Sequence, residues 1–389
     1  MRVDKRSVLK LARYLAYSEG IRFKSVAANS ALGDNAIGSP SQEMIDEIRA
    51  EMPDDHDGSE AEFILQTWLY NLILSAFEEY GHEPLSDELT DEEAEFISHV
   101  FDHSRVFTKD SFADNAYLRD IHIPETIYGD FQLRYNRFDP FEMFNYKPPV
   151  PIGVSLMVPC IGCFDDVFDF PCISQRSIGS VWMSITPNEI FTMQEPIDRA
   201  SGKVLTLGLG MGYFTYMCSL KENVESVTVV ECEQDVIDMF NEYILPQFKT
   251  KDKIRIIKVD AVEFVRDMKD GDYDYCFADI WKSAFEFEAY FAVEEICKRF
   301  TKTKVDHWIE DSFLAYLLNI VWQLVLSTVF RELDDAMFKL PPIDDTYQKM
   351  WDYLEKLYSG VTLKGEKDIT DLMRLADIRR RIRSTNLKF

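Results

Sequence analysis

Three glycines and an acidic residue at a characteristic spacing carry the clearest chemical signal in the sequence. Gly208, Gly210 and Gly212 directly follow the apolar run 204–207, and glycine permits a tight turn in which a ligand can approach bare backbone. Glu231 ends the next apolar run, 19 positions beyond Gly212. A carboxylate at this spacing reaches the tip of a neighbouring strand, where it can accept hydrogen bonds from both hydroxyls of a ribose. The pattern therefore predicts a nucleoside site.

Two further acidic residues follow apolar runs in the same way. Asp260, with Ala261 beside it, follows the run 254–259, and Asp279 follows the run 273–278. Each has a structural alternative, since Asp260 can cap the helix that follows it and Asp279 can simply end its strand. Ligands of parallel sheets bind at the carboxyl ends of the strands. The shared location of these acids is what favours a binding site.

The elements that would position these residues alternate between strand and helix. Strands are expected at 203–207, 226–231, 254–259, 273–278 and 304–309, and helices at 213–220, 233–245, 261–268 and 286–300. Strand and helix in alternation with short loops predict an α/β fold, a Rossmann-like parallel sheet with helices on both faces.

The rest of the chain divides into three regions by its pattern. Residues 1–129 are expected to be helical, including a helix at 60–80 and one that begins with a capping box at Thr90. Residues 130–185 alternate in short β-prone runs and predict an antiparallel β patch. The sheet domain then covers 186–311, and 312–389 is expected to be helical. Either the parallel sheet ends after its fifth strand, or strands from 130–185 complete it.

The carboxyl-terminal region has an apolar helix and a basic one. The apolar face of the helix expected at 312–338 forms either core, which we favour, or the surface of a homodimer. The helix expected at 370–383 is rich in arginine. Such a helix could bind a phosphate-rich partner, but we expect it to dock on the protein's own acidic surface.

Composition narrows the class of protein. The chain has 389 residues and a formal net charge of −26, which argues against a nucleic-acid partner because phosphates would be repelled. No apolar run is seen that reaches the roughly 18 residues of a membrane helix, and the start lacks a signal-peptide core. We expect a cytoplasmic protein without a membrane partner. The seven cysteines and six histidines show no complete zinc signature, so no metal is expected.

Residues 186 to about 300 are similar to class I S-adenosylmethionine-dependent methyltransferases, and most of all to their spermidine synthase branch. The similarity rests on the run Thr186-Pro-Asn-Glu-Ile-Phe-Thr-Met-Gln-Glu-Pro-Ile197, on Gly208-Leu-Gly-Met-Gly212, and on the acids at the strand ends. Dehydrogenases that bind NAD share the first glycines and the following acid, but not the aspartate at strand three. The resemblance implies S-adenosylmethionine as cofactor, with the following contacts: Gln194 with the nucleoside, Gly208, Gly210 and Gly212 with the methionine end, Glu231 with the ribose, Asp260 and Ala261 with the adenine, and Asp279 in the catalytic loop.

The sequence departs from the synthases at three positions. Met211 stands where they have an aspartate that favours decarboxylated S-adenosylmethionine, and Lys282 stands where they have a second catalytic acid. Met193 occupies the place of a tyrosine. We therefore expect a methyltransferase that acts on an unidentified small molecule or protein group, with Asp279, Trp281 and Lys282 as the catalytic candidates. Two alternatives remain: transfer of the aminopropyl or aminocarboxypropyl arm, and nucleoside binding without transfer.

Overall fold

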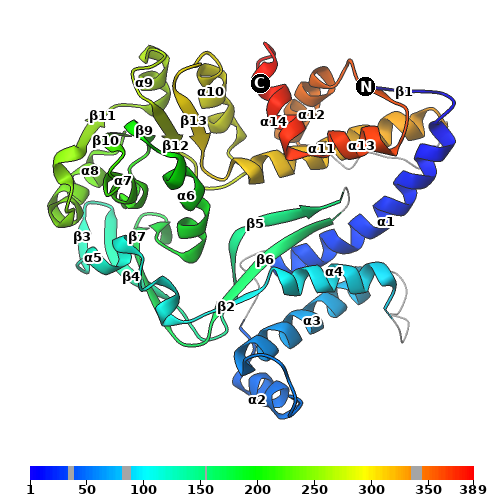
Figure 1. Ribbon diagram of the computed structural model, residues 1–389, viewed down its shortest axis with the longest axis horizontal. Coiled ribbons are helices and arrows are strands. Elements are labelled where there is room, and N and C mark those ends of the chain that lie inside the picture. The colour runs from blue at the N-terminus through cyan, green and yellow to red at the C-terminus, as the bar shows by residue number, and fades with distance from the viewer. Residues whose placement is uncertain (34–38, 81–88, 154–155, 334–343) are drawn as a thin grey trace.

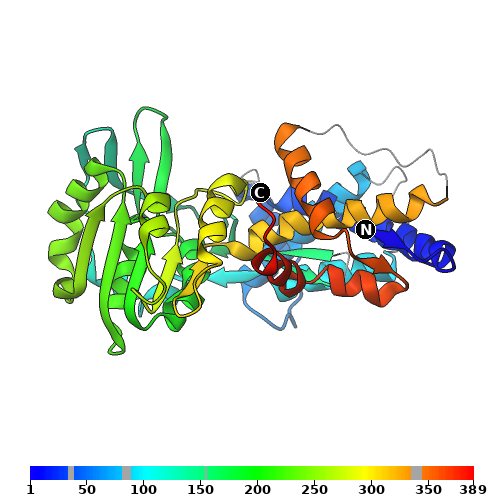
Figure 2. The ribbon, with the colours of Figure 1, turned by 90° about the horizontal axis from the view of Figure 1, so that it is seen from above.

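The structure, a computed structural model, describes residues 1–33, 39–80, 89–153, 156–333 and 344–389. Figure 1 shows a sheet with its helices at one end of the molecule and a group of helices at the other. The two groups also lie at opposite ends in the view from above (Figure 2).

The first group contains a sheet of five parallel strands in the order β11-β10-β9-β12-β13. Their bounds are β9 Gly202–Leu207, β10 Val224–Glu231, β11 Ile254–Lys258, β12 Tyr275–Ala278 and β13 Lys304–His307. Helices alternate with them: α6 Pro187–Arg199, α7 Tyr213–Ser219, α8 Gln234–Met239, α9 Ala261–Asp267 and α10 Phe287–Cys297. The central strands are buried on both faces, which explains their continuous apolar runs. This arrangement is consistent with the Rossmann-like fold predicted from the sequence.

Two smaller sheets precede the parallel one and do not join it among the described residues. One has the order β2-β6-β5 and the other β3-β4-β7-β8. The strands are β2 Arg105–Phe107, β3 Thr126–Tyr128, β4 Phe131–Phe138, β5 Phe144–Ile152, β6 Leu156–Phe164, β7 Phe168–Gln175 and β8 Ser180–Ser184. The predicted antiparallel patch is therefore present. It is not purely antiparallel, because β2 pairs with β6 in parallel; β2 and β3 also lie in the region expected to be helical.

The amino-terminal helices are α1 Val8–Gly33, α2 Gln42–Ala50, α3 Glu60–Tyr80, α4 Asp91–Asp102 and α5 Ala116–Asp120. The capping box of α4 is confirmed: Thr90 accepts from the amide of Glu93, whose carboxylate accepts from the amide of Thr90. The helical spacing of Val8, Leu11, Ala12 and Leu15 predicts a first helix over residues 5–17 only, and its predicted end is wrong. The helix continues through Gly20 because its buried face packs against α3 and, at Arg22, binds Asn319 of the carboxyl-terminal region.

The carboxyl-terminal elements are α11 Glu310–Arg331, α12 Asp345–Leu357, β14 Thr362–Leu363, α13 Glu366–Leu372 and α14 Leu375–Ser384. β14 pairs in parallel with β1 (Arg2–Val3), which ties the two ends of the described chain together. The main hydrophobic core extends from the sheet to these helices. A second core lies among α1 to α4 and also includes Phe141, Val158 and Ile161, so it crosses the division expected between residues 129 and 130.

Helix α11 corrects the expectation that no apolar stretch reaches the length of a membrane helix. α11 is long and apolar enough, by length and composition alone, to cross a membrane. Its interruptions, such as Asn319 and Gln323, are polar but uncharged, so its mean hydropathy stays high. Of its most apolar window, 67% is buried inside the protein, as in a core helix. The apolar face of α11 is therefore core, as expected.

Candidate functional site

A cavity of about 580 Å³ opens at the carboxyl edge of the parallel sheet, within the range of roughly 300–1,000 Å³ typical of ligand pockets. Gly208, Glu231, Asp260 and Asp279 line it from the ends of β9, β10, β11 and β12. The structure thus brings together the acids at the strand ends and two of the predicted glycines, Gly208 and Gly210, whereas Gly212 does not line the cavity. Strands β4 and β8 complete the wall with side chains that sequence reasoning did not find: Phe131, Trp182 and Met183.

The three glycines of the turn have positive φ angles of 97°, 54° and 75°, a region that strongly favours glycine. At Gly208 a side chain would collide with the backbone carbonyl of Asp279, and at Gly212 with the ring of Phe240. At Gly210 the nearest atom would be the Sδ of Met183, 3.9 Å away. Two of the glycines are therefore needed for packing, whereas Gly210 keeps space open in the cavity.

Helix α5 holds the glycine turn from outside the sheet. The Tyr117 hydroxyl donates to the carbonyl oxygen of Met211 at 2.6 Å, and Asn115 donates to the Tyr213 hydroxyl at 2.9 Å. The Met211 side chain is buried and lines the cavity. No local sequence signal connects residues 115–117 to a turn almost a hundred positions later, so this support was not predicted.

The Glu231 carboxylate is fixed by backbone amides. Its Oε1 accepts from the amides of Cys232 at 2.7 Å and Glu233 at 2.9 Å, and its Oε2 accepts from Leu209 at 3.2 Å. A carboxylate offers about four lone-pair sites, so it can still accept a hydrogen bond from a ribose hydroxyl. The side chain is buried, and its position is set without a ligand.

Asp260 combines the two roles considered from the sequence. Its Oδ1 accepts from the amide of Glu263 at 2.9 Å and caps α9, while the residue also lines the cavity beside Ala261. The cap directs Asp260 toward the β11 end of the cavity, next to the Glu231 end of β10. This is the place that the resemblance assigns to the adenine.

Asp279 shares the cavity with Glu189, an acid that the sequence analysis did not single out. Burial, together with the charge of Glu231, raises the pKa of Asp279 to about 7. Burial and the charge of Asp279 raise the pKa of Glu189 well above its ordinary value. Both residues line the cavity. A cation bound between them would favour their ionised forms, so this part of the site is suited to a positively charged group.

The structure does not place Gln194 in the cavity, which corrects the expected nucleoside contact. Gln194 is exposed, and its amide donates to Asp198 at 2.8 Å. In α6 the residues that line the cavity are Glu189 and Met193. They lie four positions apart and share a helix face, whereas Gln194 lies about 100° further round that helix. Helical periodicity applied to this run would have identified both.

Trp281 and Lys282 occupy different parts of the loop after β12. Trp281 is buried, and its Nε1 donates to the carbonyl oxygen of Trp308 at 3.0 Å; both tryptophans line the cavity. Lys282 is exposed, and its Nζ lies 5.8 Å from the ring centroid of Trp182. Trp281 therefore belongs to both the cavity wall and the core, and Lys282 lies at the rim.

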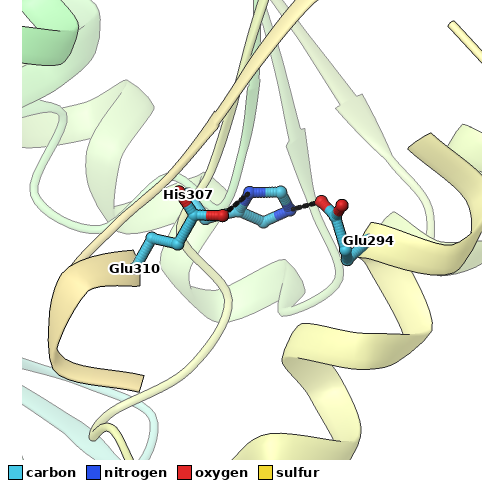
Figure 3. A group of neighbouring side chains, drawn as sticks. All are labelled: Glu294, His307 and Glu310. Atoms are coloured by element: carbon cyan, nitrogen blue, oxygen red, sulfur yellow. Dashed lines mark ion pairs between the residues drawn. The ribbon is translucent and has the colours of Figure 1, made fainter. Parts of the chain in front are cut away.

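A buried cluster behind Trp281 links the site to the carboxyl-terminal helix. His307 stacks on Trp281 with ring centroids 5.9 Å apart. Figure 3 shows His307 between two carboxylates: its Nε2 lies 3.5 Å from Glu294, and its Nδ1 lies 3.9 Å from Glu310. These three side chains are close enough to share a metal ion. Their carboxylates, however, are already paired with guanidinium groups of α14, which balance the charge: Arg379 with Glu310 at 2.7 Å, and Arg383 with Glu310 at 3.0 Å and with Glu294 at 3.5 Å.

The comparison with known families agrees with this geometry. Residues 189–312 match the model of the Spermine/spermidine synthase domain, a class I S-adenosylmethionine-dependent methyltransferase-like fold. The match covers about a third of the chain and extends from α6 to the first turn of α11. A search of curated proteins finds no match. The matched domain is spermidine synthase-like and indicates a transferase.

Proposed function

We propose that this protein transfers a group from a sulfonium nucleoside, and that it uses S-adenosylmethionine to methylate an acceptor. The observation that carries the proposal is the order of side chains along one cavity. Asp260 lies at the end of β11, Glu231 at β10, the glycine turn at β9 and Asp279 at β12. In this order they would meet the adenine, the ribose, the sulfonium and the amino acid arm of the donor.

Methyl transfer from a sulfonium is an in-line displacement, and positioning of the two partners accounts for much of its catalysis. Glu231 and Asp260 would hold the nucleoside, while Asp279 would hold the ammonium of the donor. The faces of Trp281 and Trp308 at the cavity wall would favour the positive charge on sulfur. Met211 favours the intact donor, because no acid at this position repels its carboxylate.

A second candidate is transfer of the aminopropyl arm to an amine. The Glu189–Asp279 pair favours it, since two carboxylates could bind a cationic amine and one of them could accept its proton. The match to the Spermine/spermidine synthase domain supports the same reaction. Lys282 at the rim opposes it, because a lysine repels a cationic acceptor.

Product analysis separates the candidates. The protein is incubated with a metabolite extract and either S-adenosylmethionine or its decarboxylated form, and the nucleoside product is identified by mass spectrometry. S-adenosylhomocysteine would support methyl transfer, and methylthioadenosine would support arm transfer. Binding of S-adenosylhomocysteine in calorimetry without either product would show a nucleoside-binding protein, and absence of binding would refute the proposal.

A further inference from the structure

Lys282 differs in charge from the other ionisable side chains around the cavity. Among the described residues that line it, Lys282 alone is a lysine or arginine, against five acidic residues: Glu189, Glu231, Glu233, Asp260 and Asp279. An acidic cavity needs no lysine to bind a cation. A single positive charge at its rim is suited to one negatively charged group of a ligand.

The lysine is positioned but not neutralised. Its Nζ lies over the Trp182 ring at 5.8 Å, and Trp182 in turn stacks on Phe131 with ring centroids 4.5 Å apart. Within the described ranges no carboxylate forms an ion pair with Lys282. The ammonium thus lies beside a stacked aromatic pair, with its charge available to a ligand.

The strand order places Lys282 at the end of the cavity where the donor's arm would lie. The acids assigned to adenine and ribose lie at β11 and β10, on one side of the glycine turn, and Asp279 and Lys282 follow β12 on its other side. Lys282 lies three residues beyond Asp279. An amino acid arm that passes the glycine turn would enter the part of the cavity that follows β12, where Asp279 and Lys282 offer opposite charges that match an ammonium and a carboxylate.

We propose that Lys282 binds the α-carboxylate of the donor while Asp279 and Glu189 bind its ammonium, so that Lys282 selects intact over decarboxylated S-adenosylmethionine. This inference rests on the proposed function, because it assumes a sulfonium nucleoside in the cavity. It holds for methyl transfer and for transfer of an aminocarboxypropyl arm, because both start from intact S-adenosylmethionine, but not for aminopropyl transfer, whose donor lacks the carboxylate.

The test compares two ligands that share the adenosine moiety and differ in the arm. S-adenosylhomocysteine has the carboxylate, whereas methylthioadenosine lacks the whole amino acid. Calorimetry on Lys282→Met should show affinity for S-adenosylhomocysteine lowered roughly fivefold, as for an ion pair at a partly exposed site, with affinity for methylthioadenosine unchanged. Lys282→Arg keeps the positive charge and should therefore keep the affinity for S-adenosylhomocysteine that Lys282→Met loses. In the unmodified protein, raising the salt concentration should weaken the contribution of Lys282 to this affinity.

The matched control is Lys258→Met. Lys258 ends β11 at the same edge of the sheet but does not line the cavity, so the change removes the same charge without altering either affinity. An equal effect of Lys282→Met on both ligands, or no effect on either, would overturn the inference. Failure of the unmodified protein to bind either ligand would instead refute the proposed function, and the inference with it.

Discussion

At the scale of single residues, the site is set by carboxylates whose positions are fixed before a ligand arrives. Glu231 accepts three backbone hydrogen bonds, so a ribose would meet an oriented acceptor and little side-chain entropy would be lost on binding. Removing the whole side chain would leave those buried amides unpaired, at a cost of about 1–3 kcal/mol. A test of the ribose contact therefore needs a substitution that keeps the shape.

Glu231→Gln is such a substitution. It keeps one acceptor oxygen, now neutral, and replaces the other with an NH2 group that can only donate. It should therefore weaken binding of S-adenosylhomocysteine about tenfold, or about 1.4 kcal/mol, because the charge-assisted hydrogen bond to the ribose is lost. Calorimetry measures the affinity. Glu225→Gln, on the exposed start of the same strand, should leave it unchanged. Equal affinities in the parent protein and Glu231→Gln would exclude the ribose role.

Asp279 should make both stability and binding depend on pH. Its pKa rises from 3.8 to about 7 in the folded protein, so the native state binds more protons than the unfolded state between these values. The free energy of unfolding contributed by this group therefore falls as pH rises from about 4 to about 7. A cationic ligand favours the ionised form, so binding below pH 7 should release protons. Calorimetry in buffers of different ionisation enthalpy measures this release, which should shrink in Asp279→Asn.

The same variant separates two roles of Asp279. If the carboxylate holds the donor's ammonium, Asp279→Asn should weaken binding of S-adenosylhomocysteine and lower turnover through that loss. If it is a general base, affinity should remain and turnover should be lost. We favour the first role. A variant that binds normally and transfers nothing would show that the second is correct.

The sequence predicted Glu231, Asp260 and Asp279 because each lies at the end of an apolar strand, and parallel strands end at one edge. The prediction failed for the run 186–197, where the alignment with the spermidine synthases assigned the nucleoside contact to Gln194. The phase of α6 instead turns Glu189 and Met193 toward the cavity. Lining residues from β4 and β8 were beyond prediction, since they reach the site through pairings such as that of β4 with β7, about 40 positions apart.

At the scale of elements, the glycines of the turn have two different roles: Gly208 and Gly212 allow close packing, whereas Gly210 leaves room for a ligand. Gly210→Ala should keep the fold, since no atom lies closer than 3.9 Å to the added Cβ, but should lower affinity for S-adenosylhomocysteine at least about tenfold by filling the cavity. Its positive φ costs about 1–2 kcal/mol for alanine. Gly179→Ala is the control, because its φ of 66° imposes similar strain in open space away from the site. Equal ligand affinities in both variants would contradict this role of Gly210.

Elements with local signals were predictable and those with distant partners were not. The strand–helix alternation of the parallel sheet and the capping box of α4 follow from nearby residues. The unbroken course of α1 does not, because Gly20 costs about 1 kcal/mol in a helix, and packing against elements distant in sequence, among them α3, β6 and α11, offsets that cost. The same holds for the pairing of β2 with β6.

At the scale of the whole molecule, the arginines of α14 connect the end of the chain to the site. The expectation that this basic helix docks on the protein's own acids is confirmed by ion pairs with Glu310, Glu294 and Asp311. Burial raises the pKa of Glu294. Burial also acts to raise the pKa of Glu310, but the charges of His307 and the two arginines bring it below its ordinary value. His307 connects this cluster to the cavity wall, because it stacks on Trp281, which lines the cavity.

Removing one of these arginines should therefore affect both stability and binding. Arg383→Met leaves Glu294, only 2% exposed, without its guanidinium, at an expected cost of about 1–3 kcal/mol in urea unfolding. The pKa of Glu294 should rise further, so the loss should be larger at pH 8 than at pH 5. Affinity for S-adenosylhomocysteine should fall as Trp281 loses its support. Arg380→Met is the matched control on the same helix: its side chain is 70% exposed and pairs only with Asp377 among the described residues, so it should cost less than about 0.5 kcal/mol. If the two variants lost the same stability and bound the ligand equally well, the helix would be an independent surface element and not a support of the site.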